Sequence, residues 1–149
     1  MKSLLVIGYV WPEPKSSAAG SRMLQLLEFF RNEGYKIIFA TTASKTEAMA
    51  DLPSLGIDIA KIELNNSSFD EFLKKIDPGI VLFDRFMMEE QFGWRVSEVC
   101  PAALKILDTE DLHFFRKARQ EAGKKSVELN EEMLFSDTAK REIASIYRC

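Results

Sequence analysis

Five short apolar runs recur along the chain, and most of them are separated by segments with helical periodicity. The runs are five or six residues long and rich in β-branched and other apolar residues, as strands are. The first and fourth are apolar almost throughout, which is typical of strands buried on both faces of a parallel sheet. The alternation therefore predicts an α/β protein with helices on both faces of the sheet. The runs are residues 4–9, 36–41, 57–62, 80–84 and 103–108.

Between and after these runs, apolar residues recur with the three- and four-residue spacing of one helical face. This spacing predicts a helix after the first, third, fourth and fifth runs, and one more helix near the end of the chain. The positions that show it are Met23, Leu26, Leu27 and Phe30; Phe69, Phe72, Leu73 and Ile76; Phe92, Val96 and Val99; Leu112, Phe115, Ala118 and Ala122; and Ala139, Ile143, Ile146 and Tyr147.

Several residues mark where these helices should begin and end. Gly34 is placed to adopt the left-handed conformation after the first helix, and Gly123 is placed to end the fourth. Ser68 and Glu71 have the spacing of a capping box at the start of the second helix. Asp137 is expected to cap the last helix.

We expect a Rossmann-like, doubly wound parallel sheet of about five strands in the order 3-2-1-4-5, with residues 1–149 forming one domain. The last helical pattern runs to the final residue and leads into no further strand. We therefore expect the chain to be part of a longer protein. A sheet that ends early leaves an unpaired edge and apolar surface, so we also expect association into a homo-oligomer.

The charge balance excludes one class of function. The chain has 20 Lys and Arg against 23 Asp and Glu, a net charge of −3, so we expect no nucleic-acid binding. No apolar run approaches the ~20 residues of a membrane span, and the apolar start of the chain predicts a strand rather than a signal peptide. Two cysteines make no disulfide framework, which favours the cytoplasm.

The connection after the first run, residues 10–22, is the first candidate site. It ends in small residues at a helix start, where backbone N–H groups and the helix dipole favour an anion. Gly20 and Ser21 would let a ligand approach the backbone, Arg22 would add a charged clamp, and Trp11 would stack on a sugar ring. Trp94 is expected to be packing. The glycine patterns for dinucleotides and for nucleotide phosphates are both missing, so we expect no cofactor.

Acidic residues at the ends of the fourth and fifth runs form the second candidate group. Asp84 ends the fourth run and Arg85 follows it, a charge pair that would face the cleft or else serve as a local ion pair or cap. Asp108 ends the fifth run, and Glu110 and His113 follow. These side chains can hydrogen-bond a sugar, transfer a proton or bind a divalent metal. The alternative is helix capping by Asp108 or Thr109, with acidic residues in the first turn.

The expected topology brings the two candidate groups together. Parallel strands place the loops after the first and fifth strands at the same edge of the sheet. The two loops start about 10 Å apart, because one strand lies between them. We therefore expect Arg22, Asp108 and His113 to converge there, with Asp84 between them.

A basic stretch follows the fifth run, with Arg116, Lys117, Arg119, Lys124 and Lys125. These cations would suit an anionic lipid surface, giving peripheral membrane contact, or a polyprenyl phosphate acceptor. The alternative is a solvated helix face.

Three segments together resemble the N-terminal domain of GT-B glycosyltransferases, and most closely the bacterial family 4, or group 1, enzymes. The first is the opening strand with Trp11-Pro12 and the small residues 17–22. The others are residues 108–116 after the fifth run and the closing helix, residues 139–149. The resemblance covers most of the chain, with loose motifs. The Gly-Gly pair that often follows the first strand is missing, and Pro12-Glu13-Pro14 stands there instead.

The resemblance implies two Rossmann-like domains with the active site between them. The N-terminal domain receives the acceptor, and the C-terminal domain, which this chain lacks, binds the nucleotide-sugar donor. The full enzyme would transfer a sugar to a hydroxyl acceptor on a polysaccharide, lipid or protein glycan, without a metal, and the 149-residue chain alone would be inactive. His113 and Asp108 would be catalytic. The substrate-binding residues would be Gly20, Ser21, Arg22, Trp11, Asp84 and Glu110.

Two other functions remain open at this point. One is a flavodoxin-like ligand-binding module, with the serines before the first helix at the ligand. A phosphate-accepting receiver is not supported, because Ile7-Gly8-Tyr9 stands where its acidic pair would be. The other is a small metal-dependent hydrolase that uses Asp108, Glu110 and His113 as ligands.

Overall fold

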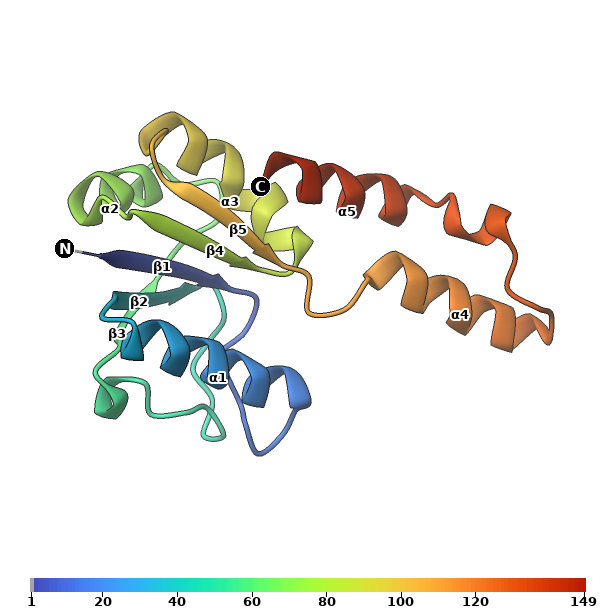
Figure 1. Ribbon diagram of the computed structural model, residues 1–149, viewed down its shortest axis with the longest axis horizontal. Helices are drawn as coiled ribbons and strands as arrows, with labels where there is room; N and C mark the ends of the chain where they lie inside the picture. Colours follow the sequence, from blue (N-terminus) through green and yellow to red (C-terminus); the bar gives the residue numbers. More distant parts are fainter. Residues whose placement is uncertain (1) are drawn as a thin grey trace.

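The computed structural model describes residues 2–149 and contains a five-stranded, all-parallel sheet. The strand order is β3-β2-β1-β4-β5, which confirms the predicted Rossmann-like arrangement (Figure 1). The strands are β1 Ser3–Gly8, β2 Lys36–Thr41, β3 Asp58–Lys61, β4 Ile80–Asp84 and β5 Leu104–Asp108.

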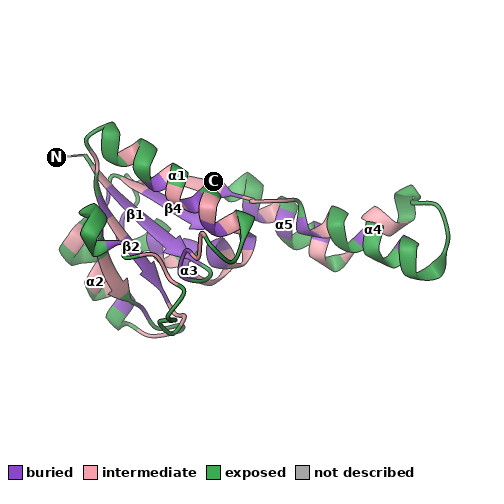
Figure 2. Cartoon of the chain, turned by 90° about the horizontal axis from the view of Figure 1, so that it is seen from below, coloured by how far each residue is buried: buried purple, intermediate pink, exposed green. Residues whose placement is uncertain are grey.

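Alternate residues of the strands pack into two hydrophobic clusters, one on each face of the sheet. On one face, Leu5 and Phe83 pack with side chains of α2 (Ser68–Ile76) and α3 (Phe86–Val99). On the other face, Val6 and Phe39 pack with α1 (Ala18–Asn32). The central strands β1 and β4 are buried along most of their length (Figure 2), as their apolar composition predicted. A short 3-10 helix, η1 Pro53–Leu55, lies between β2 and β3.

The chain after β5 forms a helical hairpin that projects beyond the carboxyl ends of the strands (Figure 1). It contains α4 (His113–Lys125), the 3-10 helix η2 (Glu131–Leu134) and α5 (Asp137–Arg148). We call this hairpin the arm. Its last helix returns to contact α3 and β5. In the part of the chain that the structure describes, no helix is both long and apolar enough to cross a bilayer.

The structure corrects three of the predicted helix boundaries. The capping box of Ser68 and Glu71 is wrong, because α2 already begins at Ser68, and the side chain of Asn66 accepts the Ser68 N–H at 2.9 Å. Ser136 rather than Asp137 caps α5, since its hydroxyl lies three residues before Ala139 and accepts that N–H at 3.1 Å.

The end of α4 also differs from the prediction. The helix passes through Gly123 and ends at Lys125, after which Ser126 takes the left-handed conformation with φ 52°. Gly123 keeps the ordinary helical twist, so it does not act as a terminator. Gly34 does behave as predicted, with φ 79° after α1.

Candidate functional site

The loop before α1 folds tightly over the start of the helix. The side chain of Ser17 caps α1 by accepting the Gly20 N–H at 3.0 Å, and Ser21 donates its hydroxyl to the carbonyl of Pro14 at 2.9 Å. A Cβ on Gly20 would stand 2.6 Å from the backbone of Glu13. Close approach of two backbone segments therefore explains this glycine. The predicted ligand contacts of Gly20 and Ser21 remain predictions.

The two tryptophans have the opposite placement to the one expected. Trp11 is 3% exposed, donates its indole N–H to the carbonyl of Ala43 at 3.1 Å and packs on Phe39. Trp94 is 49% exposed. The expectation that Trp11 stacks on a sugar ring is corrected, because its indole belongs to the hydrophobic cluster under α1 and is held there by Ala43 and Phe39.

Arg22 and Asp108 meet at the carboxyl edge of the sheet, as the topology predicted. Arg22 lies on the first turns of α1, and Asp108 is the last residue of β5. The guanidinium holds both carboxylate oxygens, with N–O distances of 3.0 and 3.3 Å. The Asp108 side chain is 8% exposed whereas that of Arg22 is 46% exposed. A half-exposed cation fixed on a buried carboxylate can receive a polar or anionic group of a ligand.

Asp84 lies beside this pair, because β4 and β5 place Asp84 and Asp108 in register. One of its carboxylate oxygens accepts the backbone N–H of Tyr9 at 3.2 Å, and Arg85 lies 3.6 Å from the other. Burial raises the pKa of Asp84 above its ordinary value, and this effect outweighs the opposing influence of Arg85. Asp84 is therefore a better proton acceptor than an ordinary surface carboxylate.

Arg85, which the sequence paired with Asp84 at the end of the fourth run, belongs to the same cluster. Its backbone has φ 76°, unusual for a residue other than glycine, and its N–H donates to the carbonyl of Asp108 at 2.8 Å. The guanidinium lies 4.8 Å from the centre of the Tyr9 ring. Unusual backbone of this kind is concentrated at ligand sites. The sequence predicted a charge pair of Asp84 and Arg85 at this strand end, but it did not predict the positive φ of Arg85.

Glu110 joins the cluster through its backbone. It also has a positive φ, 62°, and its N–H donates to Oδ1 of Asp108 at 3.2 Å. We call the five side chains Tyr9, Arg22, Asp84, Arg85 and Asp108, together with Glu110, the strand-end cluster. A hollow beside Trp11, Asp84 and Arg85 holds about 20 Å³, enough for about one water molecule. The accessible part of the cluster is therefore its rim, formed by Arg22 and by Tyr9, which is 40% exposed.

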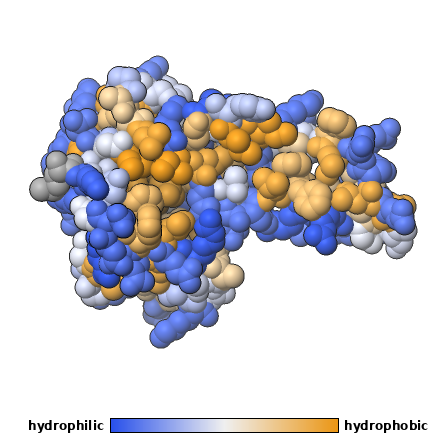
Figure 3. Space-filling view, viewed as in Figure 1, coloured by the Kyte–Doolittle hydropathy of each residue, from blue (hydrophilic) through white to orange (hydrophobic). Residues whose placement is uncertain are grey.

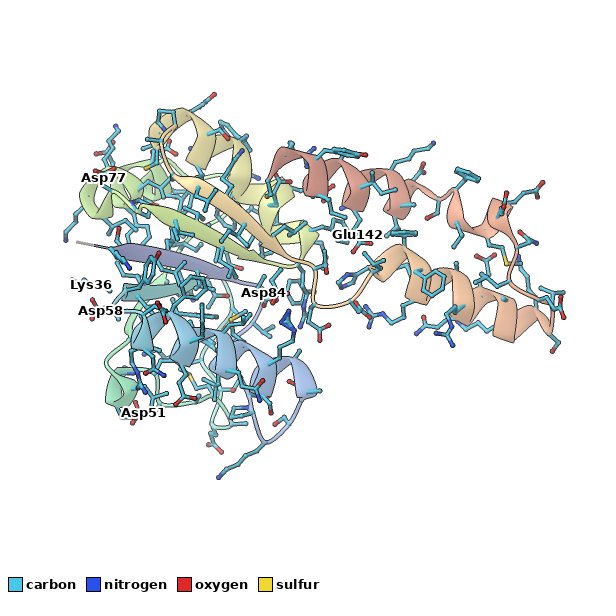
Figure 4. The ribbon with its side chains drawn as sticks, viewed as in Figure 1. Lys36, Asp51, Asp58, Asp77, Asp84 and Glu142 are labelled. Atoms are coloured by element: carbon cyan, nitrogen blue, oxygen red, sulfur yellow. The ribbon has the colours of Figure 1, made fainter. Side chains whose placement is uncertain are left out.

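His113 lies at the same end of the sheet but faces the arm. Its Nδ1 is 3.3 Å from Glu142 and 3.4 Å from Asp111, and its ring packs edge-on against Phe86. In Figure 4, Asp84 lies at the end of the sheet next to α1, whereas Glu142 lies between α4 and α5. Arg22, Asp84 and Asp108 thus gather at this end of the sheet as the topology predicted, and His113, at the same end, makes its polar contacts with Glu142 and Asp111.

The start of α4 is capped from a distance. The buried carboxylate of Glu142 accepts the backbone N–H groups of His113 and Phe114 at 3.0 and 2.9 Å. The expectation of capping by Asp108 or Thr109 is wrong, because α4 begins only at His113 and has no acidic residue in its first turn. Glu142 comes from a helix 28 residues further along, so local spacing gave no signal of this role.

The ligand set of a metal-dependent hydrolase is not assembled. Asp108 is bound to Arg22, whereas His113 is turned toward Glu142. Within residues 2–149, no group of three potential metal ligands is gathered about one point.

A larger hollow of about 570 Å³ runs along α4. The residues that line it follow Asp108 and Glu110 in the sequence. Arg116 in its wall pairs with Asp111 at 3.0 Å, and the guanidinium of Arg119 lies 5.8 Å from the centre of the Phe115 ring. The hollow therefore combines cations with apolar surface. Its lining residues are Asp111, Leu112, Phe115, Arg116, Arg119 and Gln120.

Fold and site together define a Rossmann-like α/β domain whose polar residues gather where the strand order reverses, between β1 and β4. Open parallel sheets bind ligands at this position. No protein-family model matches the chain, and no curated protein matches it either.

Proposed function

We propose that this chain is the acceptor-side domain of a GT-B glycosyltransferase, which transfers a sugar from a nucleotide sugar to a hydroxyl acceptor. The observation that carries the proposal is the strand-end cluster, with Arg22 and Asp108 paired at 3.0 Å beside the buried Asp84. It lies at the carboxyl edge of the sheet, where the resemblance of the opening segment to these enzymes places the active-site cleft.

In this proposal, the residues of the strand-end cluster have different roles in binding and in proton transfer. Arg22, half-exposed on α1, binds a polar group of the acceptor and Asp108 holds its guanidinium in place. Asp84, with its raised pKa, takes up the proton that the acceptor hydroxyl loses through one bridging water, because the hollow beside this buried carboxylate admits only about one water molecule. His113 contacts Glu142 and acts by fixing the arm rather than by touching the substrate.

The hollow along α4 indicates the chemical class of the acceptor. Its arginines suit a phosphate, and Leu112 and Phe115, which are 43% and 38% exposed, suit a hydrocarbon chain. We propose a lipid-linked acceptor, which would hold the enzyme at a membrane surface without crossing it.

A binding experiment with the 149-residue chain tests the proposal. Methyl glycosides and a short prenyl phosphate are titrated while the backbone amide NMR signals are followed. We expect shifts at the strand-end cluster for the glycosides, and along α4 for the prenyl phosphate. Arg22→Ala should weaken glycoside binding at least tenfold.

Arg31→Ala is the matched control for this experiment. Arg31 lies on the last turn of the same helix, is similarly exposed and pairs with Glu28 on its own helix. We expect it to leave binding unchanged. The proposal is rejected if no glycoside shifts the amides of Arg22, Asp84 and Asp108, or if the two arginine variants behave alike.

A further inference from the structure

A hollow of about 460 Å³ opens where α3, β5 and α5 come together, beside the C-terminus (Figure 1). It lies apart from the strand-end cluster, because Lys105 in its wall is near the start of β5, whereas Asp108 ends that strand. Figure 3 shows apolar surface over the sheet and along the arm, but the wall of this hollow is largely polar. Its polar and aromatic lining residues are Glu89, Glu90, Trp94, Ser97, Lys105 and Arg148.

Trp94 forms a fixed aromatic surface at this hollow. The guanidinium of Arg95 lies over the indole ring, 4.5 Å from its centre, and Arg95 is itself paired with Asp70 on α2. Because Arg95 covers one face of the ring and the side chain is still 49% exposed, the indole presents its other face in one orientation. An exposed aromatic face of this kind packs well on the C–H groups of a sugar ring.

The polar groups beside Trp94 are also held in place. Glu89, Gly93 and Ser97 follow at four-residue spacing and so share one face of α3. A Cβ on Gly93 would stand 2.6 Å from Oε1 of Glu89, so the glycine leaves space for this carboxylate. The hydroxyl of Ser97 donates to the carbonyl of Gly93 at 3.0 Å and accepts from Nζ of Lys105 at 2.8 Å. The ammonium group keeps further N–H donors for a ligand.

The charges around the hollow are balanced. Its wall holds two carboxylates and two cations, Glu89 and Glu90 with Lys105 and Arg148. Arg148 holds Glu89, and Arg141 holds Glu90. Phosphates and nucleic acids need unpaired cations, and a divalent metal needs unpaired carboxylates. A neutral ligand rich in hydroxyl groups, which both donate and accept, suits ion pairs of this kind beside an aromatic face.

We propose that this hollow, which we call the Trp94 pocket, binds a neutral saccharide. The sugar ring packs on the free face of Trp94, and its hydroxyl groups bond to Glu90, Lys105 and Arg148. The volume of the pocket falls within the range of small-molecule sites. The proposal does not rest on the proposed transferase function, because none of these residues belongs to the strand-end cluster.

An NMR titration of the 149-residue chain tests the proposal. The probes are methyl β-glucoside, methyl α-mannoside, cellobiose and maltose, each in the millimolar range. We expect at least one of them to shift the indole N–H signal of Trp94, together with the backbone amides of Gly93 and Ser97. The indole signal is assigned by its loss in Trp94→Leu. If none of the four sugars shifts it, the proposal is overturned.

Two variants and a matched control follow the affinity through the amides of Gly93 and Ser97. Trp94→Leu should weaken binding about tenfold, since it removes the aromatic face. Lys105→Met keeps the aliphatic stem but removes the donor, and it should weaken binding about threefold. Phe29→Leu is the control, because Phe29 is a 56% exposed aromatic residue on α1, away from the pocket. It should leave the affinity unchanged, and equal affinities of Trp94→Leu and Phe29→Leu overturn the proposal.

Charged sugars test the expected neutrality of the ligand. Glucuronate, an anion, and glucosamine, a cation, should bind more weakly than the best neutral sugar, and tighter binding of either one overturns the proposal. Arg22→Ala separates this site from the strand-end cluster. It should leave the shift of the Trp94 indole unchanged even where it abolishes shifts at Asp84 and Asp108. A sugar that shifts Trp94 but not the strand-end cluster supports the pocket and counts against the transferase proposal.

Discussion

Asp84 shows how a single residue of the strand-end cluster is tuned by the fold. The strand that carries it is buried on both faces, so its carboxylate reaches solvent only at the end of β4. One N–H donor from Tyr9 and a guanidinium at 3.6 Å do not make up for the lost hydration. The outcome is a carboxyl group that favours its protonated form more than it does in the unfolded chain.

This raised pKa predicts a pH dependence of stability. At pH values between the unfolded and the folded pKa of Asp84, the folded state binds more protons than the unfolded state. The contribution of Asp84 to the free energy of unfolding is therefore complete at lower pH, and it is lost as the pH rises through the folded pKa. Asp84→Asn removes that loss while its side-chain oxygen still accepts the Tyr9 N–H. We expect the stability of the variant relative to wild type to increase as pH rises from about 4. Urea unfolding at a series of pH values measures it, and parallel pH profiles would contradict the prediction.

At the scale of the element, the start of α1 depends on a close contact that only glycine permits. Because a Cβ at Gly20 would enter the backbone of Glu13, Gly20→Ala should destabilise the chain by about 1–3 kcal/mol. Gly123, inside α4, is the matched control: a Cβ there would meet nothing within 4 Å, and its φ is not positive. Gly123→Ala should stabilise by about 0.5–1 kcal/mol. Thermal unfolding of both variants decides, and equal melting temperatures would be inconsistent with this account.

The start of α4 depends on a residue of another helix. Glu142→Ala removes the acceptor of one buried and one partly buried N–H group and should destabilise by about 2–4 kcal/mol. Glu142→Gln keeps one acceptor oxygen and should cost less. Hydrogen exchange should become faster at the amides of His113 and Phe114 while the amides of β1 stay protected. Exchange that is unchanged at the start of α4 would show that the cap is dispensable.

The elements differ in how far the sequence predicts them. The apolar runs predicted all five strands and their order, because burial on both faces leaves a strong local pattern and crossover rules limit the topology. The strand-end cluster was predicted in part, since strand ends in a parallel sheet must share an edge. The direction of His113 was not predictable, because it is set by Glu142, which lies far along the chain. The positive φ of Arg85 likewise leaves no mark in residue type.

At the scale of the whole molecule, the arm is joined to the rest of the domain by the contacts of α5 with α3 and β5. Ile143 and Ile146 of α5 are each 41% exposed, whereas Glu142 and Ser145 are fully buried. The arm is therefore held by polar contacts rather than by an apolar interface. Helix α5 contacts α3 through two arginines, Arg148 with Glu89 and Arg141 with Glu90.

These two ion pairs join the same helices but differ in burial, which gives a matched comparison. The Glu89 side chain is 2% exposed and receives Arg148 through contacts of 2.6 to 3.1 Å, whereas Glu90 is 22% exposed. Arg148→Ala leaves a buried carboxylate without its partner and should cost about 2 kcal/mol or more. Arg141→Ala breaks a more solvated pair and should cost less than about 1 kcal/mol. Because the arm has little apolar contact to fall back on, Arg148→Ala should also release α5, seen as faster hydrogen exchange along α5 with β1 and β4 unaffected. If the two variants lose equal stability, or if α5 stays protected in Arg148→Ala, then the buried pair is not what fastens the arm.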